Sequence, residues 1–376
     1  MTEPAAEPIP LSTPDITQAE IDAVTSVLRT PHLSLGPELH AFEQALAGYH
    51  RVPHAVAVSS GTAGLHLALV TLGIGEGHEV ILPSFAFIAV ANAVLQVRAT
   101  PVFAEIDPVT LNLSPAAVEQ AITPRTRAIL VVHTFGVPAD MDALQSIARR
   151  HNLALIEDAC EAIGARFDDR PAGSFGDLAV FGFYPNKQLT TGEGGAILAR
   201  DPAHAARLRS LRNQGRNPEA GWLDHVEIGY NYRLSDLACA LGRVQLSRID
   251  EILTRRRAAA ERYQSLLGAI PGLALPPLAL PRRTISWFVY VVRLPARANR
   301  DSIQAALAAK GIATGRYFAP IHQQPAWRSH PSAVAALSLT ESIARRTLAL
   351  PFFNRITSLQ QQRVASAIRQ ALTGQD

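Results

Sequence analysis

The most informative segment of this chain is Val180-Phe-Gly-Phe-Tyr-Pro-Asn-Lys187-Gln-Leu-Thr-Thr-Gly-Glu-Gly-Gly195, which runs into a second apolar segment, Ala196-Ile-Leu-Ala199. The apolar segments on either side of Lys187 are typical of buried strands, and no helix separates them, so they suggest an antiparallel pair. A lysine held on the turn between such strands is well placed to lose its solvation. Desolvation lowers the pKa of an amine and makes it nucleophilic. The alternative for any single lysine is a solvated surface charge.

Outward from this segment, strands and helices alternate along the chain. Several strand candidates are continuous apolar runs, which indicates strands covered on both faces and therefore a mostly parallel α/β sheet. These strands are expected at Ala55–Val58, Val80–Leu82, Val102–Ile106, Ala128–Val132, Leu153–Ile156, Leu178–Phe183 and Ala196–Ala199. Helices are expected at Thr17–Arg29, near Glu38–Tyr49, from Ala63 onward, and at Ile88–Leu95, Pro115–Ala121 and Met141–Arg150.

The character of the chain changes after Asp250. A helix at Glu251–Leu267 leads through a proline-rich stretch to a strand at Trp287–Arg293, and three more helices are expected at Arg300–Lys310, Glu341–Ala349 and Ser358–Leu372. Because 376 residues exceed one ordinary core, two domains are expected. We place a large domain at residues 1–250, including an N-terminal arm, and a smaller α/β domain at 251–376.

The composition excludes several classes of protein. Hydrophobic residues make up 48% of the chain and charged residues 18%, as in globular proteins, and the net charge of +3 gives no case for nucleic acid. Two cysteines, Cys160 and Cys239, cannot form a disulfide framework or a four-cysteine metal site. The acidic, proline-rich start has no apolar signal core, and no apolar run reaches the ~18 residues that span a membrane. We expect a cytoplasmic protein with no metal and no membrane partner.

Two further segments carry chemistry. In Ser59-Ser-Gly-Thr-Ala63, small residues lie between a strand and a helix, where free N–H groups and the helix dipole bind phosphate; ordinary N-capping is the alternative. Asp158 follows a buried parallel strand at the edge where α/β sheets bind ligands, although it could equally cap a helix. A phosphate seat, a carboxylate and a desolvated lysine are the groups that pyridoxal 5'-phosphate (PLP) requires.

In these and further segments, the chain resembles the DegT/DnrJ/StrS family of PLP-dependent sugar aminotransferases. The resemblance runs almost from end to end. It is carried by Ile9–Ser12, Leu33–Gly36, Ser59–Ala63, Leu82–Phe85, Thr100–Phe103, Ile156–Ala159, Lys187 with Gly192–Gly195, Gly229–Arg233 and Phe318–His322. It implies the type I (aspartate aminotransferase) fold of PLP-dependent transferases and an amino transfer to a ketosugar, mostly as a nucleotide sugar.

The resemblance also implies a role for each matching residue. Lys187 would hold PLP as a Schiff base and act as the acid and base, and Asp158 would pair with the pyridine nitrogen. Within the seat that includes Ser60, Gly61 and Thr62 would bind the phosphate. Cofactor contacts are further implied for Phe87, stacked on the ring, for Glu161 near its other face, and for Asn231, reaching the phosphate of a neighbouring subunit.

The asparagine contact implies a homodimer with shared active sites. A plain core phenylalanine is the alternative for Phe87. The sugar or its pyrophosphate could be bound by Arg233, Arg316, Tyr317 and His322, each of which could equally serve an interface or a helix end.

One position departs from the family pattern. The family often has a serine between two aromatic residues, and its hydroxyl binds the phosphate, whereas this chain has Phe181-Gly182-Phe183. We expect modestly weaker retention of the cofactor, and an increase in PLP affinity on Gly182→Ser. A histidine in place of the lysine marks the dehydratases of the family, and Lys187 argues against that activity.

The loop after the lysine suggests the position of amination. Family members that aminate C4 tend to have Glu-Gly-Gly after the lysine, often following Thr-Thr, and this chain has Thr190-Thr-Gly-Glu-Gly-Gly195. We therefore expect transfer from L-glutamate to a 4-keto-6-deoxy nucleotide sugar, in amino-sugar or polysaccharide biosynthesis. A 3-keto sugar, a keto-inositol, and a PLP-binding regulator without turnover remain alternatives.

Overall fold

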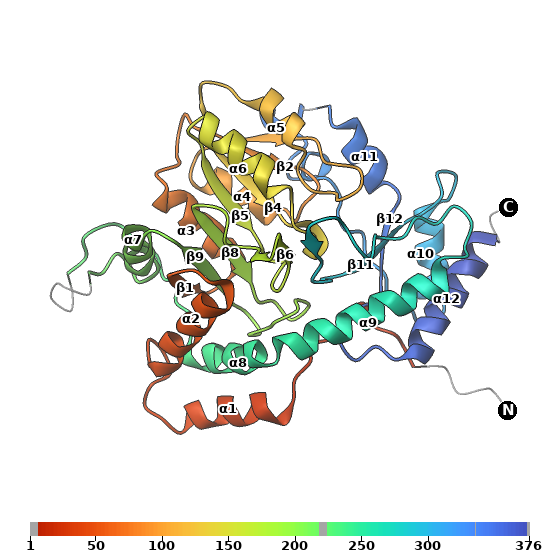
Figure 1. Cartoon of the computed structure of the whole chain (residues 1–376), viewed down its shortest axis with the longest axis horizontal. Coiled ribbons are helices and arrows are strands. Elements are labelled where there is room, and N and C mark those ends of the chain that lie inside the picture. Colours follow the sequence, from red (N-terminus) through yellow and green to blue (C-terminus); the bar gives the residue numbers. More distant parts are fainter. Residues whose placement is uncertain (1–6, 218–223, 335, 374–376) are drawn as a thin grey trace.

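The computed structural model describes residues 7–217, 224–334 and 336–373, so the first six residues of the expected N-terminal arm lie outside the described residues. Its centre is a seven-stranded sheet (Figure 1). In spatial order the strands are β1 (His54–Val58), β9 (Gly195–Ala199), β8 (Leu178–Gly182), β5 (Ala154–Asp158), β4 (Thr126–Val132), β2 (Glu79–Pro83) and β3 (Thr100–Ala104).

The sheet is parallel except for β9, which runs against both of its neighbours. The predicted antiparallel pair around Lys187 is confirmed, with Gly182 opposite Gly195 at the end nearest the lysine. β5 and β8 are parallel neighbours, with Asp158 opposite Val180. The carboxyl ends of β5 and β8 therefore meet at one edge of the sheet, as the sequence predicted.

Successive side chains of a strand point to opposite faces of the sheet. Because these strands are largely apolar, both faces are apolar, and helices cover both. In β1, Val56 packs into the core beneath one set of helices and Ala57 into the core beneath another. The first set is α3 (Gly61–Thr71), α4 (Ala89–Gln96) and α7 (Pro202–Arg212). The opposite face is covered by α2 (Pro37–His50) with α8 (Asp236–Ser247), and by α5 (Pro115–Ala121) with α6 (Met141–Arg150).

The C-terminal part has its own core. The long helix α9 (Ile249–Leu267) crosses the molecule from the end of α8 to a two-stranded antiparallel sheet of β11 (Tyr290–Arg293) and β12 (Thr347–Leu350) (Figure 1). The helices α10 (Arg300–Ala308), α11 (Ser338–Ala344) and α12 (Ser358–Thr373) complete this part, while α1 (Gln18–Leu28) packs on α8. α9 begins before residue 251, and the domain division at 250/251 stays a prediction.

Two predictions about this region are wrong. The helix expected at Glu341–Ala349 ends at Ala344, because Thr347–Leu350 is fully buried and pairs with β11. The strand expected from Trp287 begins at Tyr290, because Trp287 has φ 55°, a left-handed conformation that a strand cannot contain. Short strands at β6 (Arg166–Phe167), β7 (Arg170–Pro171) and β10 (Arg283–Thr284) form a third sheet.

Among the described residues, no helix combines the length and the apolar character that a membrane crossing requires.

Candidate active site

Lys187 lies on the turn that follows β8, with its side chain 16% exposed. Its amide donates a hydrogen bond to the carbonyl of Tyr184 (2.9 Å), which closes the turn. Its Nζ lies 3.5 Å from Oε1 of Glu161 and 3.9 Å from the centre of the Phe288 ring. The amine is thus held between one carboxylate and one aromatic face, and the surface-charge alternative does not describe it.

Glu161 is a buried carboxylate with two partners. Its Oε2 accepts a hydrogen bond from the amide of Phe135 (2.9 Å), while Oε1 faces Lys187. Burial raises the pKa of Glu161, and the nearby Lys187 offsets part of that increase. Because its pKa is raised and it lies beside Lys187, Glu161 can gain or lose its proton when the charge of the lysine amine changes.

Phe288 is a site residue that the sequence reasoning missed. The sequence predicts a strand at Trp287–Arg293 that includes Phe288, and no sequence motif identifies Phe288 as a site residue. It belongs to the segment Ser286–Phe288, which the structure ties to the lysine loop: Nε2 of Gln188 donates to Oγ of Ser286 (3.0 Å). Nη1 of Arg256, on α9, donates to the carbonyls of Trp287 (3.1 Å) and Phe288 (3.0 Å).

Asp158 ends β5 and is buried, as expected for a residue at the ligand edge of the sheet. Its Oδ1 accepts a hydrogen bond from the amide of Cys160 (3.0 Å), which uses only one of the two carboxylate oxygens. Its neighbour Glu157 points the other way and binds His133 (2.9 Å). Since the amide of Ala139 donates to Nδ1 of His133, the Nε2–H of that ring donates to Glu157. The Glu157 carboxylate therefore has a structural role, and Asp158 faces the ligand edge.

The expected phosphate seat is the N-terminus of α3. Ser60 is the N-cap residue, and its Oγ accepts a hydrogen bond from the amide of Ala63 (3.0 Å). The N-capping alternative therefore describes the Ser60 side chain. Gly61 and Thr62 are the first two residues of the helix, so their amides have no carbonyl within the helix to bind. These two amides are the free donors of the seat.

Three glycines bring other backbone segments against this helix end. A Cβ on Gly61 would lie 2.9 Å from Sγ of Cys160, and one on Gly195 would lie 2.8 Å from the amide nitrogen of Gly61. Gly182, at the end of β8, lies against Gly61 as well. Glycine allows this close approach and leaves the helix amides uncovered. With Asp158 and Lys187 at the same sheet edge, the residues fit the phosphate, ring nitrogen and aldehyde of PLP.

Other predicted residues surround this edge. Phe87 is 62% exposed, which argues against the core-phenylalanine alternative. Tyr317 packs on Phe288, and its hydroxyl accepts a hydrogen bond from Nδ2 of Asn186 (3.4 Å), next to the lysine. Burial, followed by the charge of Glu161, raises the pKa of Tyr317. The structure therefore places Tyr317 beside Lys187.

Asn231 and Arg233 lie on the segment that leads into α8. Asn231 is exposed and is paired in a β-bridge with Asn213. Nη1 of Arg233 donates to Oδ1 of Asn213 (2.9 Å). The carbonyl of Tyr232, between them, accepts from the amide of Ser59 (2.8 Å), so this segment lies next to the phosphate seat of its own chain.

Two substrate candidates have other partners. Arg316 is exposed, and its guanidinium binds Asp301 (2.7 Å) and Gln304 (3.0 Å) on α10. His322 is buried: Nε2 donates to Glu341 (3.2 Å), so Nδ1 accepts from the hydroxyl of Ser84 (2.7 Å). Both ring nitrogens of His322 are engaged, and the residue joins the end of β2 to the C-terminal part.

The loop Thr190–Gly195 is shaped largely by its backbone. Oγ1 of Thr190 donates to the carbonyl of Phe183 (3.0 Å), and Oγ1 of Thr191 donates to that of Glu193 (2.6 Å). Gly192 has φ 81° and Gly194 has φ 157°, conformations that side chains disfavour. Glu193 is exposed. Most of the Thr-Thr-Gly-Glu-Gly-Gly motif is therefore explained by loop conformation, and Glu193 is its outward-facing side chain.

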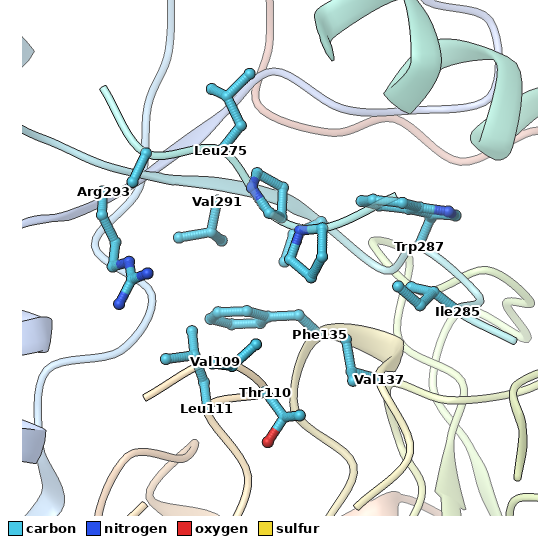
Figure 2. Close-up of a pocket in the computed structure, with 14 residues that line it drawn as sticks. Val109, Thr110, Leu111, Phe135, Val137, Leu275, Ile285, Trp287, Val291 and Arg293 are labelled. Carbon is cyan, nitrogen blue, oxygen red and sulfur yellow. The ribbon is translucent and has the colours of Figure 1, made fainter. Parts of the chain in front are cut away.

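An apolar pocket lies beside Phe135, the residue whose amide donates a hydrogen bond to Glu161. Figure 2 shows the Phe135 ring on one side of this pocket and Val291 on the other, with Arg293 at one end and Trp287 at the other. The pocket is lined by Val109, Thr110, Leu111, Phe135, Val137, Ala274, Leu275, Pro276, Pro277, Ile285, Trp287, Val289, Val291 and Arg293. Lys187 and Asp158 are absent from this lining, so the pocket is separate from the candidate site.

Comparisons with known proteins match the chain over nearly its whole length. The family model of the DegT/DnrJ/EryC1/StrS aminotransferases matches residues 14–369. A GDP-perosamine synthase of Caulobacter vibrioides is 40% identical over 368 residues, covering 97% of this chain and 98% of the relative. A dTDP-3-amino-3,4,6-trideoxy-alpha-D-glucose transaminase of Streptomyces venezuelae is 42% identical over 356 residues, covering 94% and 92%.

A solved structure also matches the chain over nearly its whole length. The PLP-form of Spr1654 from Streptococcus pneumoniae superposes with a TM-score of 0.93 at 26% identity, covering 98% of this chain and 100% of that one. The fold is the type I fold of PLP-dependent transferases, and the named transaminases among the relatives decide for an enzyme over a regulator without turnover. The chain belongs to the DegT/DnrJ/EryC1/StrS aminotransferase family and is a PLP-dependent aminotransferase.

Proposed function

We propose that this enzyme transfers the amino group of L-glutamate to a keto nucleotide sugar, with Lys187 as the catalytic residue. The observation that carries the proposal is the placement of the Lys187 amine, largely withdrawn from solvent between Glu161 and Phe288 at the sheet edge that also holds Asp158. The names of two relatives, a GDP-sugar synthase and a dTDP-sugar transaminase, support a nucleotide sugar as the acceptor.

PLP, when bound, supplies an aldehyde for the amine and a protonated ring that takes up an electron pair from the substrate carbon. Lys187 would hold it covalently and, once released, carry the proton between carbons as acid and base. Glu161, 3.5 Å from Nζ, would keep the amine oriented while its charge changes. Asp158 would hold a proton on the ring nitrogen through the carboxylate oxygen that Cys160 does not use.

The remaining cofactor contacts follow from the same geometry. The amides of Gly61 and Thr62 and the Thr62 hydroxyl would bind the phosphate, with Ser60 fixing the helix end by its N-cap bond. Phe87, largely exposed in the single chain, would cover the ring. Exposed Asn231 would reach the phosphate of a second copy, so the working form would be a homodimer.

For the sugar, we propose Tyr317 and Arg233 as the first contacts, because both lie beside the candidate site. Arg316 and His322 remain weaker candidates, since each would have to leave its present partners. The Thr190–Gly195 loop favours a 4-keto-6-deoxy sugar, although much of that motif serves the loop backbone. A 3-keto sugar is the second candidate, which the name of the Streptomyces relative favours, and a keto-inositol is the third.

The chain offers a simple test, because Lys187 and Lys310 are its only two lysines. The purified protein with PLP should show an absorption band of the lysine-bound cofactor, and borohydride reduction should attach the cofactor to Lys187. The matched control is Lys310→Arg, which should leave the band unchanged because that exposed lysine contacts Gln370 on α12. A band that survives Lys187→Ala would refute the assignment.

The substrate is tested on the same protein. L-glutamate should convert the band to that of the pyridoxamine form, and a panel of 4-keto and 3-keto nucleotide sugars and a keto-inositol should identify the acceptor by product mass and NMR. Failure of every amino donor would contradict the proposed transfer. Amination of the 3-keto sugar alone would replace the first candidate with the second.

A further inference from the structure

Cys160 lies beneath the phosphate seat and touches two of its glycines. It follows β5 by two residues, while Gly182 ends the neighbouring strand β8 and Gly61 begins α3. A Cβ on Gly182 would lie 3.2 Å from Sγ of Cys160, 3.4 Å from its Cβ and 3.7 Å from Cα of Gly61. Ordinary contacts of a Cβ are 3.4–4 Å, so the contact with the thiol is too short by a few tenths of an ångström.

Two of the three glycines of the seat, Gly182 and Gly195, differ in what would block an added side chain. At Gly195 the nearest atoms to an added Cβ are backbone atoms of Phe181, Ser60 and Gly61, all at 2.7–2.8 Å. At Gly182 the nearest atom is the end of one side chain, the Cys160 thiol. Position 182 would therefore accept a side chain if Cys160 were smaller, whereas position 195 would not.

The thiol contacts both seat glycines, but its hydrogen bond goes to the neighbouring strand. Sγ of Cys160 donates a weak hydrogen bond to the carbonyl of Val180 (3.7 Å), on the strand and not at the helix end. Burial, followed by the charge of Asp158, raises the pKa of the Cys160 thiol well above its usual range. The side chain is thus an uncharged group that fills volume and offers its hydrogen to β8.

We propose that Cys160 occupies the space that a side chain at position 182 would need, so that Cys160 and Gly182 form a coupled pair beneath the phosphate. This deepens the proposed function and rests on the phosphate lying at the α3 N-terminus. The Cys160 side chain explains why position 182 holds a glycine. Because no side chain is present at position 182, the phosphate would be bound by the backbone amides. Gly182→Ser alone should then gain little PLP affinity, against the increase that the family pattern by itself predicts, because its hydroxyl arrives with a steric conflict.

The test is a double-mutant cycle of four full-length proteins: the parent, Cys160→Ala, Gly182→Ser and both together. In the PLP-free proteins, Gly182→Ser should lower the thermal midpoint in the parent but not in the Cys160→Ala background. With PLP, Gly182→Ser should tighten binding about tenfold in the Cys160→Ala background only, the gain expected of one hydrogen bond to a charged group. Binding of pyridoxal, which has no phosphate, should not change.

The control is Cys239→Ala, because Cys239 is buried in the core under α8 and does not touch Gly182. Combined with Gly182→Ser it should give additive effects. Equal effects of Gly182→Ser in the parent and Cys160→Ala backgrounds, on both stability and affinity, would overturn the proposal. Coupling in stability with no gain specific to PLP would uphold the contact but count against the phosphate seat, and so against that part of the proposed function.

Discussion

The amine of Lys187 lies 3.9 Å from the centre of the Phe288 ring. The lysine follows a strand of the large sheet, whereas Phe288 precedes β11 of the C-terminal sheet, so the contact joins these two parts of the chain at the candidate catalytic residue. The ring face attracts the ammonium form and limits the positions that the amine can take. The Phe288 ring and Glu161 together restrict the Lys187 amine to one orientation. A fixed orientation is required for attack on a carbonyl group that is itself held in place.

Phe288→Leu should loosen the Lys187 amine without unfolding the protein. We expect kcat to fall about ten- to hundredfold, the cost of a small misplacement of a reacting group. In a Lys310→Arg background the protein has a single lysine, whose methylene protons next to Nζ should resonate upfield because they lie over the ring. In Phe288→Leu this upfield displacement should disappear. An unchanged lysine resonance would show that the contact is not populated in solution.

Arg256→Met should also loosen the Lys187 amine, but less than Phe288→Leu does. Arg256 is buried, its guanidinium forms no ion pair with a carboxylate among the described residues, and burial lowers its pKa to about 10. Its hydrogen bonds hold the carbonyls of Trp287 and Phe288, so their loss should let the Phe288 ring move. The lysine resonance should shift partway towards its position in Phe288→Leu. Arg257→Met is the matched control, since Arg257 is exposed and forms an ion pair with Glu261 one turn away.

Glu161→Gln should change how stability depends on pH. The folded-state pKa of Glu161 is raised above 4.5, so over the interval above pH 4.5 the unfolded state loses this proton first. The folded state then binds more protons, and the parent protein loses stability as pH rises through that interval. Glu161→Gln lacks this loss, so the difference in unfolding free energy should shift in favour of the variant from pH 4.5 upward. Urea unfolding of the PLP-free proteins at a series of pH values measures it, and parallel curves would contradict the raised pKa.

Gly195→Ala should damage the phosphate seat, whereas Gly48→Ala should not. The new methyl group at 195 would lie within 2.8 Å of backbone atoms of three residues, so we expect a loss of stability of about 1–3 kcal/mol and at least about tenfold weaker PLP binding. At Gly48, near the end of helix α2, nothing lies within 4 Å of the added Cβ, and stability should rise by about 0.5–1 kcal/mol. Thermal unfolding and PLP titration compare the two. Tight PLP binding by Gly195→Ala would show that the seat lies elsewhere.

Local pattern was sufficient to predict much of the fold. Continuous apolar runs predicted every strand of the large sheet to within two residues at either end, because a strand buried on both faces has no polar alternation. The helices α5 and α6 begin and end where predicted. The pattern failed at Thr347–Leu350, where four buried residues fit a helix as well as a strand and only the distant partner β11 decides between them.

The cofactor chemistry could be predicted from local sequence. A lysine on the turn between two buried strands, a carboxylate at a strand end and a small-residue turn before a helix predict PLP, because each feature depends on neighbouring residues. The surroundings of these groups depend on the folded chain. Phe288, Arg256 and the Cys160–Gly182 contact lie tens of residues from their partners in sequence, and no local spacing relates them. The same distance in sequence removed Arg316 and His322 from the first choices, because their partners Asp301 and Ser84 appear only when the chain has folded.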